Sequence, residues 1–425
     1  MSSRKDKDFK ILENIFFKTI EAVDPVKEIR KLKIDIPNGK TFFAAVGKGA
    51  GRLSKAFKEN YKGEMDGIVV IPENEECEDL GYKVFRASHP VPSEAGFQAS
   101  KALIRSVSSL EENDLFVFII AGGASSLLPF PPSGFDLEDE RKLNRTLLVS
   151  GAPISVMNAF RSEFSQIKGG KLGQAAYPCP IVTLVVCDIP GDDISLVGSG
   201  PTLQRKESNL DLLNLANNYK LNLDKKVIKF FISKVENNKL SRIRKINNKD
   251  TLILSSGSMA ITAAERIVKN VYGLNTICLS SSLEGDAEIL AKSHASIVKE
   301  IVKFDRPIKK PAVIISGGES QINLPKNYGK GGRNSHFAMA LGKEIKGLSG
   351  VTALAADTDG IDGSGSNAGA MVTGQTFEHA TILKIDLYEY LEKYDSFNGH
   401  KKMGGLFFSG PTGINVNDFR AIIIR

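Results

Sequence analysis

Tryptophan is absent from this 425-residue chain, which contains only four cysteines and five histidines. The cysteines, at positions 77, 179, 187 and 278, lack the paired spacing of zinc-binding modules, so we expect buried thiols in a reducing cytoplasm. Apolar runs are short as well, since none reaches the roughly 18 residues that a membrane-spanning helix requires. The first ten residues, MSSRKDKDFK, lack the apolar core of a secretory signal. The composition therefore predicts a cytoplasmic protein without a membrane partner.

The net charge of +7 comes from one segment, because residues 203–250 hold 12 lysines and arginines against 5 acidic residues. This segment is rich in asparagine and lacks the interleaved aromatic side chains that stack on bases, so we expect no nucleic-acid partner. Its composition predicts a solvated, partly helical surface near a domain boundary. A chain of this length normally forms two domains, which we place at residues 1–250 and 251–425.

Apolar, β-branched runs alternate with helical spacing along the whole chain, which predicts an α/β fold for both domains. Continuous apolar runs, such as 115–120 and 181–186, are typical of central strands in a parallel sheet. We expect strands at 41–46, 68–72, 115–120, 181–186, 251–254, 276–279, 313–315 and 351–356. We expect helices at 9–23, from the first glycine turn to 57, and at 93–110, 135–148, 153–164, 259–272, 286–303 and 333–341.

A lysine stands inside the first glycine-rich turn, where Gly47, Lys48 and Gly49 follow the strand at 41–46. A strand, a glycine turn and a helix form a common phosphate site, because the N–H groups at the start of the helix point at the anion. The turn approaches the dinucleotide-binding fingerprint, but Arg52 stands where the third glycine belongs. We interpret Lys48 as a catalytic cation, and a solvated lysine on an ordinary turn is the alternative.

Two further turns of the first domain contain candidate residues for substrate or phosphate binding. Ser88 and His89 lie in a loop stiffened by two prolines, where the imidazole either contacts a carboxylate or phosphate or packs the loop. Gly122, Gly123 and Ser125 follow a central strand, and glycines allow the backbone to approach an anion closely.

Asp188 opens the acidic turn CDIPGDD after the strand at 181–186. Loops at the carboxyl ends of strands bind ligands in open α/β sheets, so Asp188 is a candidate metal ligand or proton acceptor. An Asx-turn is the alternative. Nearby, Arg161, Lys168 and Lys171 add positive charge that either reaches the glycine turns or lies on a solvated helix face.

Glycine turns recur in the second half of the chain. Gly317, Gly318 and Glu319 follow one predicted strand, and Arg333 and Asn334 follow three glycines at a predicted helix start. A guanidinium group in that position would face the same anion as the N–H groups of the turn. A solvated arginine in the first helical turn is the alternative, although the helix dipole disfavours a cation there.

A second acidic turn, DTDGIDGSG, follows the strand at 351–356 and contains Asp357 and Asp359. Asp357 is a candidate metal ligand together with Asp188, and the residues alone do not decide which aspartate would be the base. Both halves of the chain contain the same three elements in the same order, at different spacings. These elements are a glycine turn, an acidic turn and a Ser-Gly-Pro-Thr sequence. Two α/β domains that point these turns into one cleft would explain this order.

Taken together, these motifs resemble the glycerate 2-kinase family, whose carboxyl-terminal part is the MOFRL domain. The resemblance implies a Rossmann-like N-terminal domain, an α/β MOFRL-type C-terminal domain and an active site in the interdomain cleft. It implies transfer of a phosphoryl group from ATP to the 2-hydroxyl of D-glycerate with Mg²⁺, and it matches the family's active-site lysine and arginine to Lys48 and Arg333. The motifs are AAVGKGAGR at 44–52, ASHPVPSEAG at 87–96, AGGASSLLPFP at 121–131, IKGGKL at 167–172, CDIPGDD with GSGPT, SGGES at 316–320, GKGGRNSH at 329–336, DTDGIDGSGSNAGA at 357–370 and GPTGINVND at 410–418.

Two stretches depart from the family's pattern. The residues after Gly122 and Gly123 read Ala-Ser-Ser-Leu-Leu instead of the usual Ser-Ala-Leu-Leu, which leaves the role of Ser125 open. Residues 203–250 match no family motif and are interpreted as a variable insert.

The residue chemistry and the resemblance agree on phosphoryl transfer, which depends on positioning and on neutralising charge. The expected partners are D-glycerate and a nucleotide, with a homodimer as the candidate assembly. An NAD(P)H-dependent hydroxypyruvate reductase is the alternative, suggested by the near-fingerprint around Gly47. A non-catalytic sugar-phosphate sensor would need the glycine turns but not so many acidic turns.

Overall fold

The computed structural model describes residues 2–203, 211–236 and 245–425. Its contacts divide the chain into two compact units, and each is described by itself. The N-terminal unit consists of Pro25–Cys187 and Asp193–Leu254, and the C-terminal unit consists of Met1–Asp24, Asp188–Asp192 and Ser255–Arg425.

The first helix belongs to the C-terminal unit, although we expected it in a domain formed by residues 1–250. Helix α1 (Ser2–Ala22) carries an apolar stripe whose Phe16 ring lies 5.1 Å from the ring of Phe407 and 5.8 Å from that of Phe419. Burial of this stripe attaches the helix to the distant end of the chain. The predicted boundary at 250 falls inside strand β6 (Asn248–Ser255), close to the end of the N-terminal unit.

The N-terminal unit is built on a six-stranded sheet with the order β3-β2-β1-β4-β5-β6. The first five strands in this order are joined by parallel pairing. The same strand order occurs in the doubly wound fold that binds dinucleotides. The direction in which successive strands are added to the sheet reverses between β1 and β4. The strands are β1 (Thr41–Val46), β2 (Met65–Pro72), β3 (Lys83–Ala87), β4 (Leu115–Ile120) and β5 (Ile181–Val186) together with β6.

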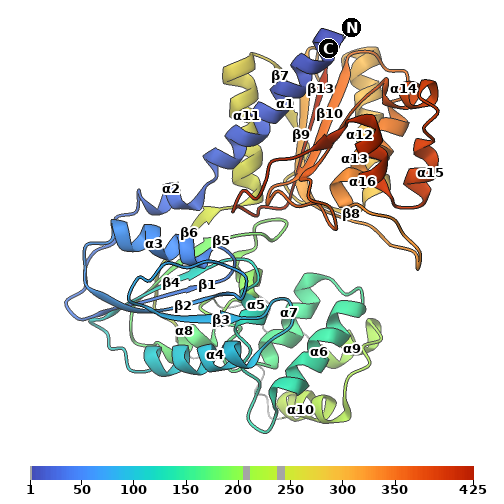
Figure 1. Ribbon diagram of the computed structural model, residues 1–425. Coiled ribbons are helices and arrows are strands. Elements are labelled where there is room, and N and C mark those ends of the chain that lie inside the picture. Colours follow the sequence, from blue (N-terminus) through green and yellow to red (C-terminus); the bar gives the residue numbers. More distant parts are fainter. Residues whose placement is uncertain (1, 204–210, 237–244) are drawn as a thin grey trace. The chain divides into compact units, whose positions relative to one another are not determined.

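Helices cover both faces of this sheet (Figure 1). Helices α2 (Pro25–Ile29) and α3 (Ala50–Asn60) share one apolar core with one face, where the rings of Phe43 and Phe57 stack at 5.0 Å. Helix α4 (Glu94–Val107) packs against β1, β2 and β3 on the other side. Both faces are buried, so the central strands read as continuous apolar runs. Short elements complete the sheet region, namely α5 (Ala124–Leu127), α8 (Lys171–Ala175) and the 3₁₀ segment Ile194–Ser199.

The described part of the basic segment is partly helical and mostly exposed or half-buried, as expected, but a few of its apolar side chains are fully buried. Its helices α9 (Leu212–Asn218) and α10 (Lys225–Glu236) form a separate apolar core with α6 (Leu137–Val149) and α7 (Ile154–Glu163). Phe231 of α10 is fully buried there, because α10 is amphipathic and turns its lysines outward. The asparagine pair at 237–238 and the other residues at 204–210 and 237–244 lie outside the described residues.

The C-terminal unit contains a mixed sheet with the order β12-β11-β10-β13-β9-β7, and β8 pairs with β9. Strand β13 (Asp418–Ile424) lies between β9 (Ala312–Gln321) and β10 (Val351–Asp357) and is antiparallel to both. The expected turn at 316–320 is therefore part of a strand. The remaining strands are β7 (Asn275–Cys278), β8 (Leu283–Asp286), β11 (Gly369–Thr373) and β12 (Leu406–Phe407).

This second sheet is also covered on both faces (Figure 1). Helices α1 and α11 (Gly257–Tyr272) pack together on one face, and α12 (Ala287–Phe304) and α13 (Arg333–Glu344) pack on the other. Three shorter helices follow on the α13 side, namely α14 (Thr376–Ile382), α15 (Leu387–Glu392) and α16 (Ser396–Met403). Both units are thus α/β, as the sequence predicts. Among the described residues, no helix combines the length and the apolar character needed to cross a membrane.

Candidate functional site

Lys48 lies at the point of the N-terminal sheet where the strand order reverses. Its turn follows β1, and the backbone N–H of Lys48 donates to Gly122 O, at 2.9 Å, in the turn that follows β4. Gly47 is required here, because a Cβ atom would lie 2.6 Å from Ala121 O. The exposed side chain of Lys48 and the Gly122–Gly123 turn therefore share the ligand-binding edge of the sheet.

The amide group at the start of α3 already has an acidic partner. Gly49 N donates to the carboxylate of Glu75 at 2.9 Å. Burial raises the pKa of Glu75, and hydrogen bonds from the backbone of Gly49 and Gly51 oppose this rise. We expected these N–H groups to hold a phosphate, and in this structure a carboxylate from the loop after β2 takes that position. The side chain of Lys48 is then the feature of this turn available to a substrate.

His89 lies next to the Gly122–Gly123 turn, as its Nδ1 atom is 2.7 Å from Ser126 Oγ. A Cβ atom on Gly123 would lie 3.4 Å from the same ring nitrogen. Burial lowers the pKa of His89, and the positive charge of Lys48 lowers it further, so the imidazole is neutral at pH 7. Ser88 has a different role, because its hydroxyl donates to Glu73 at 2.6 Å and its N–H donates to Ser93 Oγ at 3.1 Å.

Ser125 belongs to a chain of polar side chains. Its hydroxyl is 3.0 Å from Ser199 Oγ, which donates to Asn158 Oδ1 at 2.9 Å. Asn158 in turn donates to Leu196 O at 3.0 Å. This chain connects the turn after β4 to the GSGPT element, and residues Ser199 and Asn158 are buried. It holds Ser125 in a defined orientation beside the glycine turn.

The lysines of the IKGGKL motif are structural. Lys168 is 1% exposed and forms an ion pair of 2.6 Å with Glu140, which is 4% exposed. Lys171 donates to the carbonyl oxygen of Ser162 at 2.5 Å, and burial lowers the pKa of this lysine to about 7. The Nε atom of Arg161 donates to the side chain of Asn144 at 2.9 Å. All three cations have partners within the protein, so they do not form the solvated helix face that was one of the two alternatives.

In the C-terminal unit, each side-chain nitrogen of Arg333 donates to a different carboxylate. Nε donates to Asp418 at 2.7 Å, Nη2 to Asp357 at 2.8 Å and Nη1 to Glu319 at 2.9 Å. The arginine side chain is 24% exposed, whereas the three carboxylates range from Asp418 at 0% to Glu319 at 42%. Arg333 therefore lies at the solvent edge of a largely buried acidic cluster.

The sheet register explains why these carboxylates meet. Asp418 of β13 is paired with Asp357 of β10 on one side and with Gly318 of β9, next to Glu319, on the other. Gly318 has φ +111°, and a Cβ atom there would lie 2.2 Å from Leu283 N. The N–H of Gly317 donates to Ser280 O at 2.8 Å. These two glycines thus have a packing role in the strand, and their predicted phosphate contact stays a prediction.

The acidic cluster holds more negative charge than Arg333 neutralises. Burial, opposed by Arg333 but reinforced by Asp359 and Asp418, raises the pKa of Asp357 well above its usual value. Burial also raises the pKa of Glu319. Burial would lower the pKa of Arg333, but its three acidic neighbours outweigh this effect and raise it above the ordinary value. The guanidinium group is thus permanently charged.

Asp418 and Asp362 are two site residues to which the sequence analysis gave no role. Asn334 Nδ2 donates to Asp418 at 2.7 Å, and Asn334 N and Ser335 N donate to Asp362 at 2.9 and 2.7 Å. Asp362 thereby caps the start of α13 from another loop. Asp418 ends the GINVND motif just before an apolar run, and that run is the signal that could have identified β13.

Asn417 connects the two turns that contain Asp188 and Asp357, the aspartates that we predicted as metal ligands. Its side-chain Nδ2 donates to Asp188 O at 2.6 Å, and its own carbonyl oxygen accepts from Thr358 N at 3.0 Å. The loops that carry Asp188 and Asp357 are thus neighbours in the C-terminal unit. Within residues 2–203, 211–236 and 245–425, no three His, Cys, Asp or Glu side chains are grouped as a metal-binding cluster.

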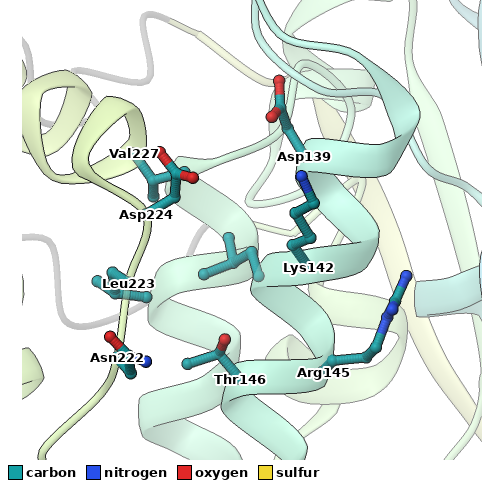
Figure 2. A pocket seen from close by; sticks show the side chains of 9 residues that line it. Asp139, Lys142, Arg145, Thr146, Asn222, Leu223, Asp224 and Val227 are labelled. Atoms are coloured by element: carbon teal, nitrogen blue, oxygen red, sulfur yellow. The ribbon is translucent and has the colours of Figure 1, made fainter.

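A cavity of about 440 Å³ lies in the helical part of the N-terminal unit (Figure 2). Figure 2 shows Thr146 of α6 directed toward the segment Asn222–Asp224, and Lys142 and Arg145 of the same helix also line the cavity. Its charged residues are largely exposed and mixed in sign, and Arg145 pairs with Glu138 at 2.6 Å. Lys48 and the glycine turns do not line this cavity, so it is not part of the candidate site.

Two family models match the chain. The model described as "Domain of unknown function (DUF4147)" matches residues 11–232, and the model described as "MOFRL family" matches residues 312–418. The first covers the sheet and helices around Lys48, and the second covers the strands and the helix that hold Arg333.

Named relatives extend over nearly the whole chain. A "D-glycerate 2-kinase" from Thermotoga maritima is 33% identical, with 96% of each chain covered, and a "Glycerate 2-kinase" from Pyrococcus horikoshii is 31% identical, with 91% of this chain and 88% of the relative covered. A "Putative hydroxypyruvate reductase" from Agrobacterium vitis is 34% identical, with 97% and 94% covered. The crystal structure of the T. maritima glycerate kinase superposes with a TM-score of 0.88 at 33% identity and covers 100% of both chains. Both family models, the full-length relatives and the superposed crystal structure all agree. The chain therefore belongs to the glycerate 2-kinase family.

Proposed function

We propose that this protein transfers the terminal phosphoryl group of ATP to the 2-hydroxyl of D-glycerate, giving 2-phosphoglycerate and ADP. The observation that carries the proposal is the guanidinium group of Arg333, which is fixed by three carboxylates at the edge of a buried acidic cluster. Full-length similarity to proteins named glycerate 2-kinase supports glycerate as the acceptor.

Fixed positive charge is what phosphoryl transfer needs most, because negative charge spreads over the oxygens of the transferred group. Arg333 offers a planar group with two Nη nitrogens that can bind two phosphoryl oxygens at once. The partner of Nη1, Glu319, is 42% exposed and is the contact that a phosphoryl oxygen would replace most easily. Lys48 supplies a second cation from the turn after β1.

Carboxylates of the two acidic turns would serve as ligands of a divalent cation such as Mg²⁺. Burial, reinforced by the charges of Asp359 and Asp418, raises the pKa of Asp357, and Asn417 ties the loop of Asp188 to the neighbouring turn. Mg²⁺ normally uses one or two carboxylates together with phosphate oxygens and water. We propose that Asp188 and Asp357 hold the ion, which when bound would neutralise charge on the nucleotide phosphates. A carboxylate of these two turns would accept the proton of the glycerate hydroxyl.

We propose further that both units contribute to one active site, with Lys48 from the N-terminal unit and Arg333 from the C-terminal unit. The C-terminal unit contains Arg333 and the acidic turns of Asp188 and Asp357, and the second cation, Lys48, comes from the N-terminal unit. If both cations act on the same phosphoryl group, their substitutions should not be additive in turnover. The Lys48→Ala/Arg333→Lys double variant tests this, and fully multiplicative losses would argue for separate roles.

The proposed activity is tested by incubation with D-glycerate, ATP and MgCl₂, followed by phosphorus NMR of the product. We expect the signal of 2-phosphoglycerate, and a 3-phosphoglycerate signal would contradict the proposed position of transfer. A parallel incubation with hydroxypyruvate and NADH or NADPH tests the reductase named for the A. vitis relative. Oxidation of the nicotinamide without phosphorylation of glycerate would overturn the proposal in favour of a reductase.

A further inference from the structure

Asp418 is the most highly connected carboxylate of the C-terminal unit that the proposed reaction has not yet used. Oδ1 accepts from Arg333 Nε at 2.7 Å and from Asn334 Nδ2 at 2.7 Å. Oδ2 accepts from Ser320 N at 2.8 Å and from Ser320 Oγ at 2.9 Å, and it also contacts Arg420 Nη2. Its side chain is 0% exposed, so water does not compete for these contacts.

The two oxygens of Asp418 serve two different parts of the unit. Oδ1 faces the first turn of α13, whereas Oδ2 is attached to β9 and to Arg420 of its own strand. The carboxylate is therefore held on the sheet through Oδ2 and holds the guanidinium group of Arg333 through Oδ1. Burial would raise the pKa of Asp418, but Arg420 and Arg333 outweigh this effect and keep the carboxyl ionised.

The three partners of Arg333 differ in how readily a substrate can replace them. Glu319 is 42% exposed and Asp357 9%, and both contact the Nη nitrogens. Asp418 contacts Nε and is inaccessible, so a phosphoryl group that binds the Nη edge would leave this contact in place. An arginine side chain loses considerable rotamer freedom on fixation, and a permanent buried partner provides that fixation before the substrate arrives.

We propose that Asp418 is a positioning residue for phosphoryl transfer, which anchors the Nε edge of Arg333 so that the Nη edge faces the transferring group. The inference rests on the proposed function for its kinetic consequence. Its structural content, a buried anchor for one edge of the guanidinium group, does not depend on the identity of the substrate.

The kinetic test is a double-variant cycle between Asp418 and Arg333. Asp418→Asn keeps the shape of the side chain and removes its charge, and we expect a fall in kcat of about 100-fold, the loss typical of a group misplaced by about 1 Å. In the Arg333→Lys background the same substitution should lower kcat less than about threefold, because the group that Asp418 positions is already gone. A purely structural role would lower the melting temperature equally in both backgrounds without this difference in kcat.

Ser320→Ala is the matched control, because it removes a hydrogen bond to Oδ2 of the same carboxylate and leaves Oδ1 with Arg333. We expect it to lower the melting temperature, because the hydroxyl group also accepts a hydrogen bond from Arg420. We expect kcat to stay within about twofold of wild type, since the backbone N–H of Ser320 and the side chain of Arg420 still hold Oδ2. If Asp418→Asn does not fold because Arg420 is left without a counter-charge, Asp418→Glu retains the charge and displaces the carboxylate by one methylene group. Asp418→Glu is then expected to lower kcat by the same factor when residue 333 is arginine, and to have little effect on kcat in Arg333→Lys.

A spectroscopic measurement separates this inference from the proposed function. The Nε–H signal of Arg333 in ¹⁵N-labelled protein, assigned by its disappearance in Arg333→Lys, should exchange slowly with water in wild type. It should exchange fast in Asp418→Asn, or in Asp418→Glu if that variant is used, and remain slow in Ser320→Ala. An unchanged signal, or equal losses of kcat in both backgrounds, would overturn the positioning role. A wild-type protein without kinase activity but with these signals would contradict the proposed function alone.

Discussion

The backbone N–H of Gly49 donates a hydrogen bond of 2.9 Å to the carboxylate of Glu75, at the start of helix α3. The helix dipole and the amide hydrogens, which in many related turns attract a phosphate, are thus satisfied within the protein. We therefore propose that the side chain of Lys48, and not the backbone of its turn, carries the positive charge offered to a substrate.

Substitution of Glu75 should therefore act on stability. Glu75→Ala leaves Gly49 N without its acceptor and should lower the free energy of unfolding by about 1–2 kcal/mol, whereas Glu75→Gln keeps an acceptor and should cost about 0.5–1 kcal/mol. Thermal and urea unfolding measure both. The exposed neighbour variant Glu76→Gln is the control, and a Glu75→Ala protein as stable as wild type would show that the carboxylate is not a cap.

Lys48→Ala should lower kcat by about 10²–10³-fold while the melting temperature changes little, because the exposed side chain provides charge rather than packing. Steady-state kinetics with glycerate and ATP, together with a thermal melt, test this. Lys55→Ala, which removes an exposed cation from helix α3 after this turn, should leave kcat unchanged. Turnover of Lys48→Ala close to that of wild type would exclude a catalytic role.

Arg333→Lys should lower kcat/KM by about 10²-fold although the charge is kept, since an ammonium group cannot hold three carboxylates and bind two phosphoryl oxygens in one plane. Lys343→Arg, a substitution of the same kind on the solvent side of the same helix, should be silent. Full activity of Arg333→Lys would mean that a point charge is enough and that the planar group is dispensable.

The Lys168–Glu140 pair should be a stability determinant. Lys168→Met leaves the buried carboxylate of Glu140 unpaired and should destabilise the protein by about 3–5 kcal/mol, and adding Glu140→Leu should recover much of that loss. Lys226→Met, which breaks a more exposed pair with Asp139, should cost less than about 1 kcal/mol. Unfolding curves measure these changes in the free energy of unfolding. A Lys168→Met protein as stable as wild type would contradict the buried ion pair.

The pKa of His89 should respond to Lys48. Burial and the charge of Lys48 both disfavour the imidazolium form and lower the pKa, so removal of the lysine should raise it toward the ordinary value. An NMR titration of the histidine resonances in Lys48→Ala measures this rise, with His89→Gln for the assignment. Lys55→Ala should leave the titration unchanged. A pKa of His89 that does not rise in Lys48→Ala would place the two groups too far apart to act together.

The local sequence was sufficient to predict the buried strands of the first sheet, but it predicted the strands of the second sheet much less well. Strands β1, β4 and β5 match the predicted ranges residue for residue, because each is an uninterrupted apolar run between turns. The segment at 316–320 was expected as a turn because of its two glycines. It is a strand because β13 pairs with it from about a hundred residues away, a relationship that no local pattern encodes.

The candidate site also depends on contacts between residues that are distant in the sequence, and these could not be predicted. Turns rich in glycine and aspartate were identifiable, since such residues after an apolar strand are uncommon without a local reason. Glu75 and Asp418 were not assigned a role, because what they do depends on partners that are distant in the sequence, Gly49 for the first and Arg333 for the second. A carboxylate inside a motif gives no indication of which arginine it will meet.

The position of β13 between β9 and β10 has a consequence for the order in which the protein is made. As the chain emerges from the ribosome, residues 25–254 contain a complete sheet and can fold early, whereas β9 and β10 have no central partner until residues 418–424 have been synthesised. Helix α1, although it is made first, must wait for the same strands, because its apolar stripe packs on Phe407 and Phe419. The arginine that we propose for catalysis thus acquires its buried anchor, Asp418, as one of the last events of biosynthesis.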